Sequence, residues 1–129
     1  MIVDTSALAA VMFNEPDADR LRAMLLADGA TLSAPNLLEL TTVVDRRGSA
    51  ELSTALTEVL TTLRVSIAPF TEQHALIGRA AYRRFGRGSG HPAQLNFGDC
   101  MSYALSVVSG EPLLFVGDDF AQTDVASAL

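Results

Sequence analysis

Short apolar segments alternate with longer amphipathic segments along the chain, and this alternation constrains the fold more than any other feature. The segments expected to form strands are 2–3, 31–33, 65–68 and 113–116. The last of these is continuously apolar, which is typical of a strand buried on both faces. Strands that alternate with helices form a mainly parallel sheet covered by helices on both sides. The sequence therefore predicts the α/β class, as a three-layer α/β/α sandwich with a short sheet.

Six helices are expected between these strands, where apolar residues recur at helical spacing. Capping residues and prolines indicate where they begin: Asp4 or Thr5 caps the first, Pro16 opens the second and Pro35 opens the third. In the last helix, Ala104, Val107 and Val108 are expected to face inward. There is no internal repeat, linker or change of composition, so residues 1–129 are expected to form one domain.

Cysteine usage and hydropathy indicate the compartment. Cys100 is the only cysteine, so an intramolecular disulfide is ruled out and a cysteine-based zinc site is disfavoured. No window approaches ~20 uninterrupted apolar residues, and the first residues lack the pattern of a signal peptide. We therefore expect a cytoplasmic protein that has no membrane partner.

Acidic residues follow the first and the last expected strand. Asp4 comes directly after segment 2–3, and Asp118 and Asp119 come within three residues of the end of segment 113–116. In parallel sheets, ligands bind beyond the carboxyl ends of the strands. Glu39 and Asp99 lie on helices, and Asp99 falls in a first turn, where the helix dipole favours a negative charge. Three to five carboxylates are thus expected to converge in one cleft.

Converging carboxylates repel one another, so they either take up protons or bind a cation. Carboxylate oxygens without nearby histidines suit Mg²⁺ or Mn²⁺ better than zinc. Such a metal can activate a water molecule and neutralise the charge that develops on a phosphate. The pattern therefore points to metal-dependent hydrolysis of a phosphodiester. For any single acid, a role as an ordinary helix cap or turn residue is an equally good explanation.

Four blocks of sequence carry a family resemblance. They are M-I-V-D-T-S-A-L at 1–8, residues 35–39, L-N-F-G-D-C-M-S-Y-A at 95–104, and P-L-L-F-V-G-D-D-F at 112–120, the last followed by Thr123 and Asp124. In order and spacing these blocks resemble the PIN-domain proteins, in particular the VapC toxins of type II toxin–antitoxin systems. The resemblance covers essentially the whole chain.

The resemblance implies a Mg²⁺-dependent endoribonuclease that cleaves RNA phosphodiester bonds with a metal-activated water, and Mn²⁺ as a substitute for Mg²⁺. It implies Asp4, Glu39, Asp99 and Asp119 as catalytic acids, with Asp4 and Asp99 as the metal ligands. Ser6 matches a small hydroxyl residue that hydrogen-bonds a ligand or water in the site.

The last block departs from the family pattern. Many relatives carry an acid where this chain has Gly117, and Asp118 stands beside that position. It is therefore open whether Asp118, Asp119 or Asp124 faces the metal, and we rank Asp119 first.

The resemblance also implies partners: a small cognate antitoxin, an RNA substrate and a second copy of the chain in a homodimer. An antitoxin arginine that reaches the carboxylates would be a plausible means of inhibition. The apolar face near Leu21, Met24 and Leu37 is the expected contact surface for the antitoxin.

The formal net charge of −6 at first disfavours a nucleic-acid partner. Without the four acids assigned to the site, however, nine arginines would leave only −2, so much of the acidity belongs to the site itself. The chain has no lysine, and four of its arginines fall in one stretch. These are Arg79, Arg83, Arg84 and Arg87, which either line an RNA path or form the solvated face of a helix.

Two other functions are consistent with parts of the sequence. An Asp-dependent phosphatase or phospho-acceptor would use Asp4 as its nucleophile, but Ser6 stands where such enzymes usually need a second acid. The other alternative is a non-catalytic, PIN-like binding module. Cys100 is expected in the core rather than as a nucleophile. Tyr103, one turn after Asp99, either approaches the site or packs with its hydroxyl in solvent.

Overall fold

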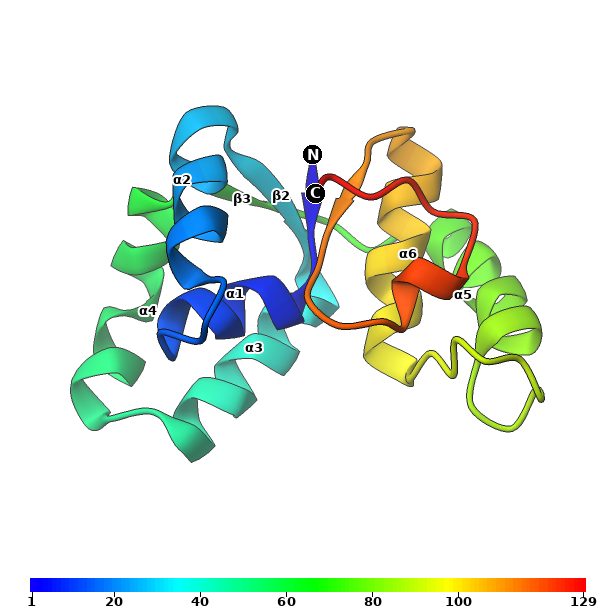
Figure 1. Cartoon of the computed structure of the whole chain (residues 1–129), viewed down its shortest axis with the longest axis horizontal. Helices are drawn as coiled ribbons and strands as arrows, with labels where there is room; N and C mark the ends of the chain where they lie inside the picture. Colours follow the sequence, from blue (N-terminus) through cyan, green and yellow to red (C-terminus); the bar gives the residue numbers. More distant parts are fainter.

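A central parallel sheet separates two layers of helices (Figure 1). The computed structural model describes all 129 residues. The strands are β1 (Ile2–Val3), β2 (Ala30–Ser33), β3 (Val65–Ala68) and β4 (Leu113–Leu114). Their order is β3-β2-β1-β4, and every neighbouring pair is parallel, which confirms the predicted α/β class.

The strand β4 is shorter than the apolar segment from which it was predicted. It ends at Leu114, whose carbonyl oxygen accepts a hydrogen bond from the backbone N–H of Asp4 at 2.9 Å. Two residues later, the N–H of Val116 donates to Ser6 Oγ at 3.1 Å instead of to a neighbouring strand. The chain therefore leaves the sheet beside Asp4.

All six expected helices are present. They are α1 (Thr5–Met12), α2 (Ala18–Asp28), α3 (Ala34–Arg47), α4 (Ala50–Thr62), α5 (Glu72–Phe85) and α6 (Phe97–Ser109), and a short 3₁₀ helix, η1 (Phe120–Gln122), follows the last strand. The start of α2 lies two residues beyond the predicted Pro16. Pro16 instead occupies a turn closed by the Ala18 N–H, which donates to the Glu15 carbonyl oxygen at 2.9 Å.

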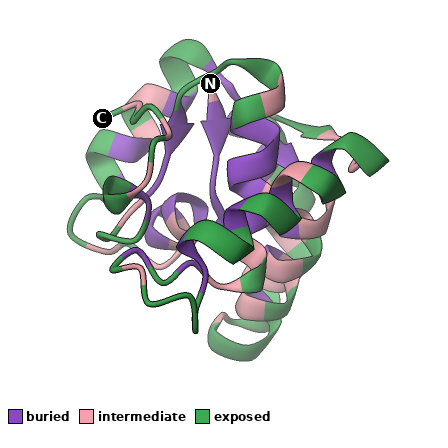
Figure 2. Cartoon of the chain, turned by 90° about the vertical axis from the view of Figure 1, so that its right-hand side faces the viewer, coloured by how far each residue is buried: buried purple, intermediate pink, exposed green.

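Alternate residues of the central strands face two separate cores. Val3 and Leu114 pack with α1, α2, α3 and α4 on one side of the sheet. Ile2 and Leu113 pack with α5 and α6 on the other side. Figure 2 shows the buried residues along the strands and on the helix faces that meet them. This arrangement is the predicted three-layer sandwich.

Two predictions about helix faces are wrong in part. Leu21 is fully buried in the first core and is not available to an antitoxin, whereas Met24 and Leu37 are partly buried against that core, so the surface expected for the antitoxin is reduced to these two. Val107 is 45 % exposed rather than turned inward. The reason is that the buried face of α6 includes two serines, Ser102 and Ser106, which the apolar periodicity does not reveal.

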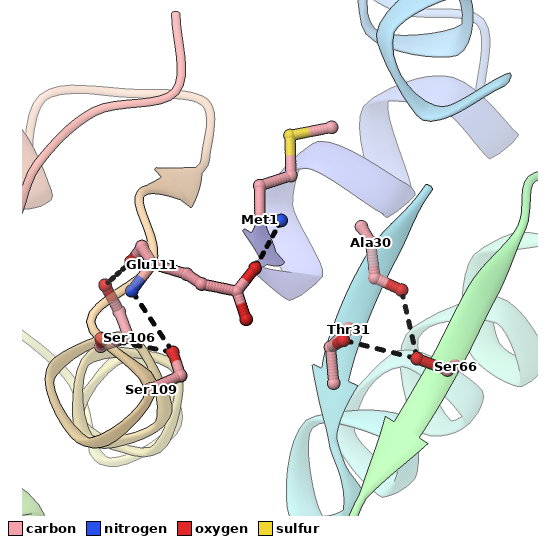
Figure 3. A network of polar contacts seen from close by, with 7 residues as sticks. All are labelled: Met1, Ala30, Thr31, Ser66, Ser106, Ser109 and Glu111. Carbon is pink, nitrogen blue, oxygen red and sulfur yellow. Dashed lines mark hydrogen bonds and ion pairs between the residues drawn. The ribbon is translucent and has the colours of Figure 1, made fainter. Parts of the chain in front are cut away.

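The amino ends of the strands are closed by paired polar groups (Figure 3). The Met1 amino group lies 2.6 Å from the carboxylate of Glu111. The hydroxyls of Thr31 and Ser66 are 3.2 Å apart, and Ser106 Oγ donates to the Glu111 carbonyl oxygen at 2.6 Å. None of the helices is both long enough and apolar enough to cross a membrane.

Candidate active site

Asp4 lies at the centre of the carboxyl end of the sheet, where β1 ends and α1 begins. Its side chain caps α1 by accepting hydrogen bonds at Oδ2 from the Ser6 N–H (2.9 Å) and the Ser6 hydroxyl (2.6 Å). Its other oxygen, Oδ1, accepts a 2.6 Å hydrogen bond from the Ser102 hydroxyl of α6. The residue is only 3 % exposed, so its carboxylate is held between two elements by neutral donors.

Glu39 extends from α3 toward the first turn of α6. Its Oε2 accepts hydrogen bonds from Thr5 Oγ1 at 2.6 Å and from Asn36 Nδ2 at 3.0 Å. Asn36 Nδ2 also donates to the Gly98 carbonyl oxygen at 3.0 Å, and this contact links α3 to α6. A Cβ atom at Gly98 would clash with Glu39 Oε1. The absence of a side chain at Gly98 therefore lets Glu39 approach Asp99.

Asp99 occupies the third position of α6 and forms a capping box with Asn96. The Asp99 N–H donates to Asn96 Oδ1, and the Asn96 N–H donates to Asp99 Oδ2, both at 2.8 Å. Burial is the main cause that raises the pKa of the Asp99 carboxyl to about 7; the hydrogen bond from Asn96 opposes this rise, and the charges of Asp4, Asp119 and Glu39 contribute to it. Asp99 is thus close enough to the other three acids for their charges to disfavour its ionised form.

The pKa of Asp4 is raised as well. Burial is the main cause, the hydrogen bonds from Ser102 and Ser6 oppose it, and the negative charge of Glu39 adds to it. The ion pairs of the chain involve none of the acids Asp4, Glu39, Asp99 and Asp119. The hydroxyl and amide donors orient these carboxylates, but no protein cation balances their charge.

The acids of the last block lie in different surroundings. Asp119 precedes η1 and is exposed, and it is the one acid of this block whose charge raises the pKa of Asp99, so we group it with Asp4, Glu39 and Asp99 as the candidate acid cluster. Asp118 is exposed and forms no hydrogen bond or ion pair with a side chain. Asp124 is turned toward α5 and α6, where it accepts hydrogen bonds from Arg84 Nη1 (2.9 Å) and the Tyr103 hydroxyl (2.7 Å). The structure does not bring Asp124 to the cluster.

The four arginines between positions 79 and 87 also differ in their surroundings. Arg84 is committed to Asp124, and its guanidinium lies 4.5 Å from the centre of the Phe85 ring. Arg79, Arg83 and Arg87 are exposed and form no ion pair.

Two residues near Asp99 prove to have packing roles. Cys100 is buried in the second core, as predicted, and burial raises the pKa of its thiol to about 12, so a nucleophilic thiolate is not available. Tyr103 directs its hydroxyl to Asp124. Burial and this hydrogen bond raise the pKa of Tyr103 to about 12.

Sequence reasoning missed three polar residues of the site. Ser102 and Asn36 are fully buried, Thr5 is nearly so, and all three side chains donate to Asp4 or Glu39. The available signal was a polar residue at a position where the helix pattern calls for an apolar one. Asn36 also keeps its Oδ1 buried without a hydrogen-bond partner, which is unusual away from a functional site.

The donor set fits a hard divalent cation. It consists of carboxylate oxygens, with no histidine or accessible thiolate, and such sets suit Mg²⁺ or Mn²⁺. No three acidic, histidine or cysteine side chains are close enough to enclose a metal ion by themselves. Mg²⁺ is usually held by one or two carboxylates and keeps several waters. Asp4 and Asp99, with Glu39 and Asp119 around them, match that kind of site.

Comparison with known proteins gives a consistent result. The family model "PIN domain" matches residues 1–126. The ribonuclease VapC28 of Mycobacterium tuberculosis is 48 % identical over 130 residues, which cover 100 % of this chain and 98 % of that protein. The ribonuclease VapC42 of the same species is 44 % identical over 129 residues, which cover 99 % and 98 %.

A solved structure agrees with the fold. The crystal structure of Mycobacterium tuberculosis VapC20, described as a sarcin–ricin loop cleaving toxin, matches with a TM-score of 0.74 and 20 % identity, over 98 % of this chain and 97 % of that one. The sheet, the acid cluster and the family match together define a PIN-domain protein. Within that class, the chain belongs to the VapC ribonuclease toxin family.

Proposed function

We propose that this protein is a Mg²⁺-dependent endoribonuclease and the toxin of a type II toxin–antitoxin pair. One observation carries the metal dependence: Asp4, Glu39, Asp99 and Asp119 gather at one end of the sheet without a cationic side chain among them. RNA as the substrate is supported by membership of the VapC family, whose curated relatives are named ribonucleases.

In this proposal, Asp4 and Asp99 hold the metal ion. When bound, the ion would supply an activated water and would neutralise charge on the phosphate. Asp99, with a pKa of about 7, would give up its remaining proton to bind the cation. Glu39 and Asp119 add negative charge and offer oxygens that can accept hydrogen bonds from water in the site. Ser6 orients Asp4, since its Oγ lies 2.6 Å from Asp4 Oδ2.

RNA would approach past the arginines on α5 and in the loop that follows it. Arg79, Arg83 and Arg87 are exposed without acidic partners, so they can contact phosphates. Arg84 is a weaker candidate because Asp124 already pairs with it. We further propose a cognate antitoxin and a homodimer as the physiological partners. An antitoxin arginine would find several carboxylates without protein counter-ions at this end of the sheet.

The phosphatase alternative is disfavoured by the surroundings of Asp4. A phosphatase of this kind usually has a second acid two residues after its nucleophile, whereas this chain has Ser6 there, whose hydroxyl donates to Asp4 Oδ2 at 2.6 Å. A stable acyl-phosphate on Asp4 would revive that function. The failure of a divalent ion to bind would favour a non-catalytic module.

Cleavage of structured RNA by the purified protein tests the proposal. With Mg²⁺ or Mn²⁺ the protein should cut the RNA, and EDTA should stop it. Asp4→Ala and Asp99→Asn should each lower the cleavage rate at least about 100-fold, because several kcal/mol of charge stabilisation are lost. Asp119→Asn should lower it more than Asp118→Asn, its matched neighbour. Circular dichroism would verify folding, and cleavage that survives both Asp4→Ala and Asp99→Asn would contradict the metal-site assignment.

A further inference from the structure

Asp4 is contacted by a serine of α6, Ser102, in addition to Ser6. Ser102 lies one helical turn after Asp99 and is fully buried. Its hydroxyl donates to Asp4 Oδ1 at 2.6 Å, and it makes no other side-chain hydrogen bond. The two residues are 98 positions apart in the sequence. The contact therefore ties the helix that carries Asp99 to the strand that carries Asp4.

A hydroxyl at this position is costly unless it has a partner. A buried hydroxyl without a hydrogen-bond partner destabilises the folded protein, because it gives up its hydrogen bonds to water. Alanine, which stands two positions further along at Ala104, would fill a buried helix face without this cost. Because Asp4 is the sole side chain that Ser102 contacts through its hydroxyl, the reason for a serine here lies in Asp4.

The Ser102 hydroxyl also determines how the Asp4 carboxylate is turned. Ser6 holds Oδ2 from the same helix turn, and Ser102 holds Oδ1 from a different helix. Two donors on different elements fix the rotation of the carboxylate about its Cβ–Cγ bond, whereas Ser6 alone leaves Oδ1 without a donor. Hydrogen bonds to ligating groups orient those groups, and their loss commonly weakens metal binding by about 10–100-fold.

We infer that Ser102 is a positioning residue of the metal site, which orients the Asp4 carboxylate and fixes Asp4 relative to Asp99. This inference rests on the proposed metal-dependent function. It assigns to Ser102 a role that depends on its hydroxyl, and not on its volume.

The helix α6 provides a matched control. Ser106 is one turn further along and 3 % exposed, and its hydroxyl donates to the Glu111 carbonyl oxygen at the opposite end of the sheet, also at 2.6 Å. Ser102→Ala and Ser106→Ala each remove one buried hydroxyl from the same helix. They should lose similar stability, but Ser102 alone reaches an acid of the site.

Titration with Mn²⁺, followed by the electron paramagnetic resonance signal of the free ion, tests the inference without relying on cleavage. Ser102→Ala should raise the Kd for Mn²⁺ about tenfold, and Ser106→Ala should leave it within about twofold of wild type. Ser102→Thr keeps the hydroxyl while crowding the core, so it should retain an affinity within about threefold of wild type even if its melting temperature falls.

A double variant tests whether Ser102→Ala weakens Mn²⁺ binding through Asp4 or by disturbing the structure more generally. In an Asp4→Asn background, Ser102→Ala should cause no further loss of Mn²⁺ affinity, because the group that it positions has already been changed. Equal affinities of Ser102→Ala and wild type, or an equal loss in Ser106→Ala, would overturn the inference and leave the proposed function intact. Absence of Mn²⁺ binding by the wild type would overturn both.

Discussion

The two ends of the parallel sheet differ in whether their charged groups are paired with groups of opposite charge. At the amino ends of the strands, the positive Met1 amino group lies 2.6 Å from the negative Glu111 carboxylate, and the hydroxyls nearby are paired with one another or with carbonyl oxygens (Figure 3). At the carboxyl ends, Asp4, Glu39 and Asp99 accept hydrogen bonds only from neutral hydroxyl and amide donors. One end is electrically balanced, and the other is not.

This difference shows what neutral donors can and cannot do. Hydroxyl and amide groups orient a carboxylate and partly offset its burial, but they carry no charge to cancel the repulsion between acids. The pKa values of Asp4 and Asp99 are consequently raised. The balanced end stabilises the fold, whereas in the proposed function a cation from solution would offset the charge at the unbalanced end.

The largest effect of this contrast should be on stability as a function of pH. The pKa of Asp99 is about 7 in the folded chain against an ordinary 3.8, so folding favours the protonated carboxyl. Its contribution to stability is full below about pH 4 and is lost as the pH rises through about 7. Without divalent ions, urea denaturation should show the free energy of unfolding falling by roughly 2–4 kcal/mol over this range.

Substitutions at the two ends of the sheet should change the pH dependence of the free energy of unfolding differently. Asp99→Asn stays neutral, so it should flatten the pH dependence and exceed the wild type in stability near pH 8. Glu111→Gln removes the partly exposed ion pair at the balanced end, so it should lower the free energy of unfolding by less than about 1 kcal/mol and keep the slope. A wild-type stability that does not fall with pH would contradict the account of the acid cluster.

A smaller effect, on the rate of cleavage, is expected from a substitution at Gly98, whose lack of a side chain leaves space for Glu39. In Gly98→Ala, the new Cβ would clash with Glu39 Oε1, so the Glu39 carboxylate must move from its place in the site. We expect cleavage at saturating Mn²⁺ to fall about tenfold, since misplacement of a functional group by about 1 Å can cost that much or more. Stability should change little, because alanine is the better helix former.

The Glu39→Ala background provides the control for Gly98→Ala. A shortened side chain at position 39 does not meet the added methyl group, so combining the two substitutions should cost no more activity than Glu39→Ala alone. Additive losses would mean that Gly98→Ala acts on the site by another route.

Much of the fold and part of the site follow from local sequence. The expected strand 65–68 matches β3 residue for residue, and Asp4 is placed by the strand that precedes it. Asp99 is placed by its position in the first turn of α6. These features depend on capping, periodicity and strand ends, which act over a few residues.

The rest depends on contacts between distant segments. Ser102 reaches Asp4 across 98 residues, and Asn36 reaches Gly98 across 62, so neither contact leaves a local pattern. Asp124 lies in the block that resembles the family motif, yet the structure pairs it with Arg84, 40 residues away. The position of Asp124 thus depends on α5 and α6, which carry its partners Arg84 and Tyr103.

Calorimetric titration of the wild type with Mg²⁺ or Mn²⁺ near pH 7, in two buffers of different ionisation enthalpy, tests the central claim most directly. The claim is that the acids at the carboxyl end form a site for a divalent cation. We expect saturable binding accompanied by proton release, since the pKa of Asp99 is about 7 and a bound cation would displace its proton. Asp99→Asn should abolish the proton release and weaken the binding. A wild type that binds neither ion, or that binds as well as Asp4→Asn and Asp99→Asn do, would contradict the claim.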